Sequence, residues 1–116
     1  SLLMSCLFCA ILAHEVPARI LYEDEDLAVI QDVNPQAPTH VLVVPRKHIA
    51  TLNDLQPDDD GLVGRLFRQA AAVAAERGVA ASGYRALFNC NRQAGQTVFH
   101  LHLHVIGGRP LGWPPG

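Results

Sequence analysis

The sequence predicts an α+β fold, in which one antiparallel sheet of five strands carries a long helix and a short helix. Three observations predict it: five short apolar runs suited to strands, one long amphipathic stretch, and mostly short turns between consecutive runs. A length of 116 residues allows one core, so we expect a single domain, 1–116. We expect residues 1–4 to be disordered or foreign to the native chain.

The first half of the chain predicts a short helix followed by three strands. Residues 7–15 have the apolar spacing of a helix, which must stop before Pro17. The three strand-like runs that follow span residues 18–22, 27–30 and 40–44. Four acidic residues separate the first two runs, which indicates a hairpin with a solvated turn.

The second half predicts the long helix and the last two strands. Proline and three aspartates at 57–60 suit a helix start, because acidic groups complement the positive end of the helix dipole. Gly78 suits its end. We expect strands at 84–88 and at 98–106, the second being the longest in the protein.

Composition excludes several classes of protein. A net charge of −2 with 49% apolar residues argues against disorder and gives no basic footprint for nucleic acid. No apolar run approaches the roughly 18 residues that span a bilayer, and the N-terminus does not read as an export signal. We expect a cytoplasmic protein with neither nucleic acid nor membrane as a partner. The charged fraction of 17% is low for a soluble domain and favours self-association.

Three of the six histidines lie in the segment His100-Leu101-His102-Leu103-His104. On a strand these imidazoles share one face, about 6.6 Å apart, while Phe99 and the intervening leucines anchor the other face in the core. One imidazole could attack a phosphoryl group while another donates hydrogen bonds. Two alternatives are polar residues on a half-exposed strand and a three-histidine catalytic zinc site, which the length of the row disfavours.

The segment from His100 to Ile106 resembles the motif His-φ-His-φ-His-φ-φ of the histidine triad (HIT) superfamily, φ being apolar. Residues 34–48, NPQAPTHVLVVPRKH, and the ending WPPG at 113–116 resemble its Hint branch, the histidine triad nucleotide-binding proteins. The likeness runs from about Cys6 to the last residue. It implies a HIT-like fold and a purine nucleoside phosphoramidase, a hydrolase that cleaves the P–N bond of adenosine 5′-phosphoramidates through a covalent AMP–histidine intermediate.

The resemblance also implies the catalytic roles, residue by residue. His102 is the nucleophile that takes the AMP group, and His104 donates hydrogen bonds to the phosphate. The hydroxyl of Thr97, where the family usually has serine, protonates or orients the leaving amine. His40 matches a fourth family histidine that supports the triad, and a satisfied core histidine is the alternative. No metal is required for this chemistry.

The nucleotide contacts follow from the same resemblance. Asp32 matches an acidic residue that accepts hydrogen bonds from both ribose hydroxyls, and a turn-capping aspartate is the alternative. Val33 would pack on the purine base. In the loop beside the phosphate, Gly95 lets the backbone approach the ligand closely. The complete set of expected nucleotide contacts is Asp32, Val33, Asn89, Gly95, Gln96, Thr97, His102 and His104.

Cys6 and Cys9 form a C-x-x-C pair, which is either half of a metal site or a redox pair. No strand precedes Cys6, and this disfavours the redox alternative. His48 and His100 are the partners of such a pair in metal-binding members of the family. The four residues would hold a structural zinc ion that closes the N-terminal segment onto the sheet, and His100 would then be unavailable as a catalytic base.

The Gly- and Pro-rich segment 107–116 is expected to be a C-terminal tail. The resemblance implies a homodimer whose two sheets are joined, with each tail docked near the partner's site and Trp113 shaping the choice of leaving group. Two other functions stay open: a dinucleoside polyphosphate hydrolase or nucleotidyl transferase of the same fold, and a non-catalytic nucleotide-binding interaction module. His104 weakens the transferase, because that branch has glutamine there.

Overall fold

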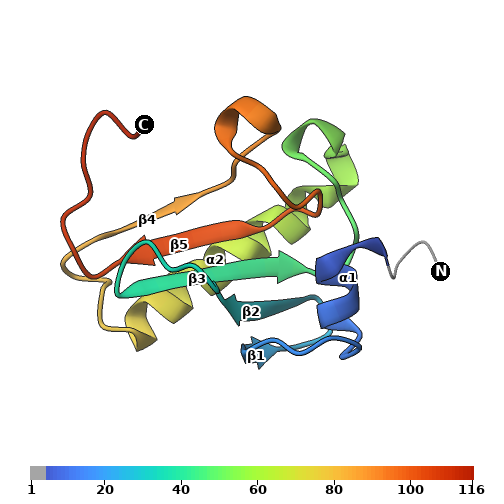
Figure 1. Cartoon of the computed structure of the whole chain (residues 1–116), viewed down its shortest axis with the longest axis horizontal. Helices are drawn as coiled ribbons and strands as arrows, with labels where there is room; N and C mark the ends of the chain where they lie inside the picture. The colour runs from blue at the N-terminus through green and yellow to red at the C-terminus, as the bar shows by residue number, and fades with distance from the viewer. Residues whose placement is uncertain (1–4) are drawn as a thin grey trace.

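The computed structural model describes residues 5–116, so the prediction made for residues 1–4 lies outside the described residues. The chain forms one five-stranded antiparallel sheet in the order β1-β2-β3-β5-β4 (Figure 1). The helices are α1 (Leu7–Leu12) and α2 (Asp60–Glu76), and the strands are β1 (Ile20–Glu23), β2 (Leu27–Gln31), β3 (Thr39–Pro45), β4 (Tyr84–Leu87) and β5 (Leu103–Gly107). The predicted α+β fold, with five antiparallel strands, one long helix and one short helix, is confirmed.

The two helices lie on opposite faces of the sheet, and each closes an apolar cluster. The cluster under α2 contains Leu66, Ala70 and Val73 of the helix together with Leu27, Val29, Val41, Val43, Leu103 and Val105 of the strands. The cluster under α1 contains Phe8, Ile11 and Leu12 together with Ala28, Ile30, Leu42 and Val44. The central strand β3 is therefore buried along its whole length, since side chains on both of its faces are covered.

The last strand is shorter than the sequence predicts, and this displaces part of the histidine segment. β5 begins at Leu103, so His100 and His102 precede the strand and only His104 lies in it. Phe99, expected in the core, is 47% exposed. The physical reason is Pro45. The ladder between β3 and β5 ends at the pair Val43–Leu103, and two residues farther along β3 lies Pro45, which has no N–H to continue it.

The alternation of side chains persists into the irregular segment before β5. Leu101, Leu103 and Val105 are all buried in the cluster under α2. The rings of His102 and His104 lie 5.0 Å apart. The predicted row of imidazoles is thus correct for His102 and His104. The structure makes β3, with seven residues, the longest strand.

Within residues 5–116, neither helix has both the length and the apolar character needed to cross a membrane.

Candidate functional site

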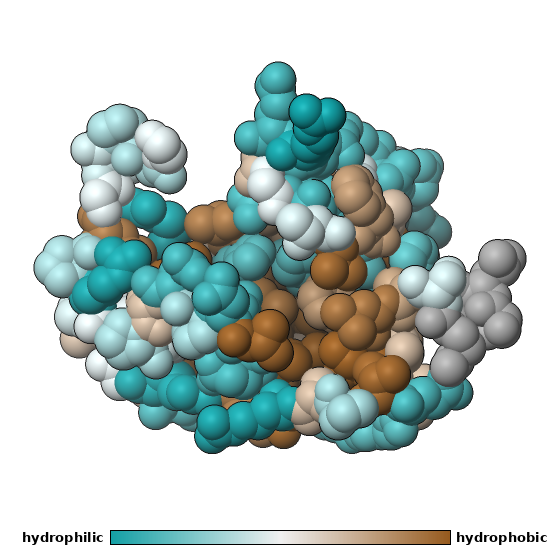
Figure 2. All heavy atoms as spheres, in the orientation of Figure 1, coloured by the Kyte–Doolittle hydropathy of each residue, from teal (hydrophilic) through white to brown (hydrophobic). Residues whose placement is uncertain are grey.

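A cavity of about 550 Å³ opens between α1, the β2–β3 loop and the end of the histidine segment. Its apolar wall includes Phe8, Ile11, Ile30, Val33 and Leu42, and its polar end includes Asp32, His40, Asn89, Thr97, His102 and His104. Figure 2 shows apolar side chains gathered around a hollow on the face of the molecule turned toward the viewer. Such a cavity suits a ligand that has an apolar ring at one end and an anionic group at the other.

His102 presents an unshared electron pair to this cavity. Its Nδ1 lies 2.7 Å from the backbone carbonyl oxygen of His100, which can only accept, so Nδ1 carries the proton and Nε2 does not. The ring of Phe8 packs against the imidazole at a centroid distance of 4.9 Å and an interplanar angle of 76°. Burial lowers the pKa of His102, which keeps the ring neutral at physiological pH. A neutral imidazole held in this way can act as a nucleophile.

In His104 the proton lies on the other ring nitrogen than in His102, and a series of hydrogen bonds determines this. The backbone N–H of Gln36 donates to Nδ1 of His40 over 3.0 Å, so neutral His40 carries its proton on Nε2. That nitrogen lies 2.9 Å from Nδ1 of His104, which must therefore accept. The proton of neutral His104 is consequently on Nε2. His104 offers the cavity an N–H donor, whereas His102 offers it a lone pair.

Burial keeps the imidazole rings of His40 and His104 uncharged. It lowers the pKa of His104 to about 4, and the neighbouring His102 and His40 add to the effect. Burial also lowers the pKa of His40, against the opposing influence of the Asp32 carboxylate, which lies 3.3 Å from Nε2 of His40. His40 is a buried core histidine, as one alternative holds, and it is also the link between the β2–β3 loop and His104.

Asp32 both caps the turn that follows it and lines the cavity. One carboxylate oxygen accepts the backbone N–H of Asn34 at 2.8 Å, as the turn-capping alternative expects. The residue also lines the cavity, with its other oxygen beside His40. Next to it, Val33 is 99% exposed at the rim, so its side chain is available to contact a ligand.

Of the four nucleotide contacts expected in the loop between β4 and β5, three line the cavity. Asn89, Gly95 and Thr97 line the cavity, and Gly95 adopts the left-handed conformation with φ +90°. Gln96 is buried: its Oε1 accepts from the backbone N–H of Asn91, and its Nε2 donates to the carbonyl oxygens of Ala50 and Val98 at 2.9 and 3.1 Å. The Gln96 side chain therefore braces the loop, and Gln96 is not among the residues that line the cavity.

Beside the cavity, four side chains converge into a cluster suited to a metal ion. The Nε2–H of His100 donates to the carbonyl oxygen of Pro45 at 2.7 Å, which leaves its Nδ1 unprotonated. That Nδ1 lies 3.4 Å from Sγ of Cys6, 3.5 Å from Sγ of Cys9 and 3.1 Å from Nδ1 of His48. All four ligand atoms lie within 4.8 Å of one another.

These separations fit zinc. A tetrahedral ion with Zn–N near 2.0 Å and Zn–S near 2.3 Å requires nitrogen–nitrogen and nitrogen–sulfur distances of roughly 3.3 to 3.5 Å. Two thiolates and two imidazoles are the donor set of structural zinc sites. Burial and the adjacent Cys6 raise the pKa of Cys9 to about 11, so a bound dication is what would make the Cys9 thiolate available at neutral pH.

A second cluster, Asp32, His40 and His104, has the same compactness but not the right protonation. The His40 nitrogen that faces the other two residues is Nε2, and it carries a proton because Nδ1 accepts from Gln36. A protonated nitrogen cannot bind a metal ion. Of the two clusters found in residues 5–116, only the cysteine–histidine cluster therefore suits a metal, and the second is a hydrogen-bonded relay.

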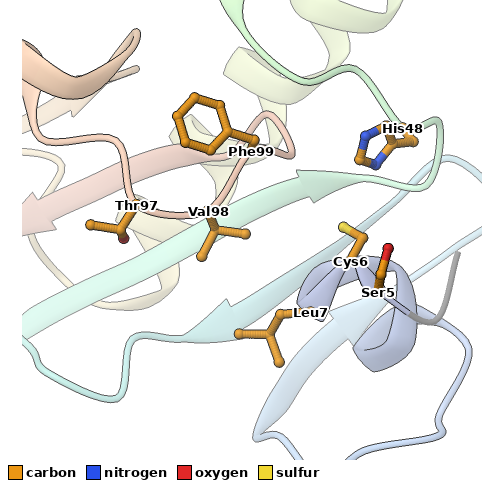
Figure 3. A pocket seen from close by; sticks show the side chains of 7 residues that line it. All are labelled: Ser5, Cys6, Leu7, His48, Thr97, Val98 and Phe99. Carbon is orange, nitrogen blue, oxygen red and sulfur yellow. The ribbon is translucent and has the colours of Figure 1, made fainter. Parts of the chain in front are cut away.

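A second hollow, of about 500 Å³, lies between the metal cluster and the first cavity. Figure 3 shows Cys6 and His48 at one end of it and Thr97 at the other, with Phe99 and Leu7 on opposite sides. Leu7, Thr97 and Val98 line both hollows, so Thr97 stands at their border.

Comparison with known proteins identifies the family. Residues 5–110 match the family model described as scavenger mRNA decapping enzyme C-term binding. The purine nucleoside phosphoramidase of Escherichia coli is 42% identical over 106 residues, which cover 91% of this chain and 89% of that protein. The chain belongs to the histidine triad family. The predicted family membership is thereby confirmed.

Solved structures agree with this assignment. The HIT family hydrolase from Legionella pneumophila matches with a TM-score of 0.94 at 47% identity, over 96% of this chain and 99% of that one. A Zn-bound histidine triad family protein from Mycobacterium smegmatis matches with a TM-score of 0.78 at 37% identity, over 92% and 77%. Together with the cluster geometry, these relatives support hydrolase activity on a nucleotide-binding fold and confirm the predicted zinc site at Cys6, Cys9, His48 and His100.

Sequence reasoning missed Gln36 and Phe8 as parts of this site. Gln36 acts through a backbone N–H, which every residue except proline possesses, so no residue type marks it. Phe8 was identified only as part of a helical apolar stripe. Its packing on the rings of both His100 and His102 is a tertiary contact between residues far apart in the chain.

We expect one zinc ion per chain and its loss on replacing one ligand. Cys9→Ser should reduce the zinc content well below half an ion per chain and lower the thermal midpoint, because a structural zinc site contributes directly to folding. Elemental analysis and thermal unfolding measure both effects. Cys90→Ser, at a half-buried cysteine outside the cluster, is the matched control and should keep its zinc. Full zinc occupancy in Cys9→Ser would contradict the site.

Acidification should destabilise the protein partly through His104. Its pKa is about 4 in the folded chain and 6.5 in an exposed imidazole, so below pH 6.5 the unfolded chain binds a proton that the folded chain resists. The stabilisation is present above pH 6.5 and is lost as the pH falls toward 4. We expect the free energy of unfolding to fall by about 1 kcal/mol between pH 7.5 and pH 5. This is less than the whole pKa difference would give, because the ring is partly solvated.

Urea unfolding at the two pH values measures this loss, and His104→Asn should reduce it. Zinc release on acidification would affect wild type and His104→Asn alike, so the difference between the two proteins reports His104. If His104→Asn kept the full wild-type dependence, His104 would not be one of the groups that cause it.

Proposed function

We propose that the protein hydrolyses the P–N bond of adenosine 5′-phosphoramidates through a covalent AMP–histidine intermediate, as in the Hint branch. One observation carries this proposal: His102 and His104 lie 5.0 Å apart at the same cavity with opposite tautomers. A lone pair beside an N–H donor is what a phosphoryl group needs for attack and for charge stabilisation. The name of the Escherichia coli relative, purine nucleoside phosphoramidase, supports the substrate class.

The proposed reaction has two steps. Nε2 of His102 attacks phosphorus, the Nε2–P bond forms, and the P–N bond to the amine breaks. The leaving amine takes a proton from the Thr97 hydroxyl, which is reprotonated by solvent water. Water then attacks phosphorus and gives one proton back to the solvent, the Nε2–P bond breaks, and AMP is released with His102 neutral again. Throughout, the Nε2–H of His104 donates to the phosphate oxygens, where negative charge increases.

The rest of the cavity would hold the nucleotide. Its ribose would lie at the carboxylate of Asp32, whose oxygens accept hydrogen bonds. Its base would lie between exposed Val33 and the apolar wall around Phe8. Asn89 and Gly95 would face the phosphate from the β4–β5 loop. At the border of the second hollow, Thr97 stands where the leaving amine would depart.

Turnover of adenosine 5′-phosphoramidate tests the proposal. His102→Ala should lose at least about 10³-fold in kcat, and His104→Ala about 10²-fold, the cost of removing one donor to a developing oxyanion. Mass spectrometry of wild type quenched during turnover should show an AMP-sized adduct on His102. His14→Ala, at an exposed histidine, should turn over at the wild-type rate.

Two results would redirect the assignment. Equal background rates in wild type and His102→Ala would remove the enzyme assignment and leave a nucleotide-binding interaction module, whose AMP affinity would survive in His102→Asn. Faster cleavage of a dinucleoside polyphosphate than of the phosphoramidate would favour the polyphosphate hydrolase.

We further propose a homodimer in which the tail of each chain reaches the partner's cavity. β4 pairs with β5 on one side only, so its other edge is open to a second sheet. Trp113 is 84% exposed at the end of the tail, and a tryptophan so placed suits contact with another chain.

Sedimentation should give a mass twice that of one chain. Trp113→Ala should spare hydrolysis when ammonia leaves and change the ranking of bulky leaving amines several-fold. A monomeric mass would contradict the dimer, and an unchanged ranking of leaving amines would contradict the docking of the tail at the partner's cavity.

A further inference from the structure

The turn after β5 is seated against the β2–β3 loop at two points. The Nε–H of Arg109 donates to the backbone carbonyl oxygen of Gln36 over 3.0 Å. One residue earlier, Gly108 has φ +96°, and a Cβ added there would lie 3.0 Å from Cβ of Pro38. A hydrogen bond and a close approach thus attach the beginning of the tail to the loop that leads into His40.

Gln36 is also the residue at which the relay to His104 begins. Its N–H donates to His40, and its side-chain amide donates to the carbonyl oxygen of Asn34 at 2.9 Å. The N–H and the carbonyl of Gln36 belong to the two peptide groups on either side of its Cα. Only the φ and ψ rotations of Gln36 separate these two groups, so a carbonyl anchored by Arg109 leaves the N–H fewer ways to turn away from His40.

We propose that Arg109 is a positioning residue for the reaction, which holds Gln36 so that its N–H stays on Nδ1 of His40 and the proton of His104 stays on Nε2. Its kinetic consequence rests on the proposed function, whereas its effect on the histidines does not. Arg109 does not itself line the cavity or contact the reacting groups; among the described residues it reaches the cavity wall only through Gln36.

Loss of the hydrogen bond between Arg109 and Gln36 would change which ring nitrogens of His40 and His104 donate and which accept. When the Gln36 N–H turns away, neutral His40 can carry its proton on Nδ1, and its Nε2 becomes an acceptor. His104 then donates from Nδ1 to His40 and presents a lone pair to the cavity. A lone pair repels the phosphate oxygen that the N–H would bind, so the group facing the phosphate changes from attractive to repulsive.

The nucleotide contact at Asp32 is held independently of Arg109. The backbone N–H of Asp32 donates to the carbonyl oxygen of His40 at 3.1 Å, and one of its carboxylate oxygens accepts from Asn34. Loss of the Arg109 bond should therefore lower kcat and leave KM nearly unchanged, because His104 acts mainly on the transition state.

Three variants test the proposal. Arg109→Met keeps the stem and removes every donor, whereas Arg109→Gln places an amide N–H at the same distance along the side chain as the arginine Nε. Arg85→Met is the matched control, because Arg85 also donates to the tail, to the carbonyl oxygen of Gly112 at 2.8 Å, but not to the β2–β3 loop. The substrate is adenosine 5′-phosphoramidate, and each protein is used as the full chain loaded with zinc.

We expect Arg109→Met to lose roughly three- to tenfold in kcat with KM within about twofold, the range expected for one hydrogen bond. Arg109→Gln should recover at least half of the wild-type kcat, and Arg85→Met should equal wild type. Equal losses in the Met and Gln variants at 109, an equal loss in Arg85→Met, or a rise in KM alone would overturn the proposal.

Imidazole ¹⁵N chemical shifts supply a readout that does not depend on turnover. Wild type should show His40 and His104 protonated at Nε2, and Arg109→Met should shift both toward a mixture of tautomers. Wild-type shifts in Arg109→Met would overturn the positioning role, whatever its kcat. If wild type fails to cleave the phosphoramidate while the shifts change as expected, the proposed reaction fails and the role of Arg109 in setting the tautomers stands.

Discussion

The end of the β3–β5 ladder at Pro45 is the constraint on which both functional clusters depend. Proline has no N–H to donate to the facing strand, so the ladder ends at the pair Val43–Leu103, and beyond it the N–H of Leu101 donates to the carbonyl oxygen of Ile49. The freed carbonyl of Pro45 accepts from the ring of His100. That ring thereby turns toward Cys6 and Cys9, while two residues later His102 faces the cavity.

Backbone groups then determine what each histidine can do. Burial lowers the pKa of all three triad imidazoles, so charge does not distinguish them at neutral pH. Their hydrogen-bond partners do. The carbonyl oxygens of Pro45 and His100 each fix a proton on one nitrogen, which leaves an unprotonated nitrogen facing the cysteines in His100 and one available to the cavity in His102. A backbone N–H, relayed through His40, leaves a donor in His104.

His100 connects the two clusters without entering the cavity. Its ring completes the cysteine–histidine cluster, its carbonyl holds the proton of His102, and Phe8 packs against both rings. A zinc ion at the cluster would immobilise the residue that orients His102 and would contact no substrate. The metal and the chemistry can thus be separate in function although they share one residue, as expected of a structural site.

The sequence by itself determined the order of the elements, the family, the C-x-x-C pair and the pairing of His102 with His104. These depend on apolar periodicity and on short spacings such as C-x-x-C and alternate histidines, which lie within one segment of chain. That His48 and His100 join the cysteine pair is implied by the family resemblance alone, because both lie far from Cys6 and Cys9 in the chain. It misplaced the start of β5 and the burial of Phe99, and it did not foresee that Gln96 would brace its own loop. Those outcomes depend on Pro45 and Ala50, partners 55 and 46 residues away from His100 and Gln96. Only the tertiary structure decided which nitrogen of each histidine carries the proton, because backbone carbonyls and N–H groups set it and these are the same at nearly every residue.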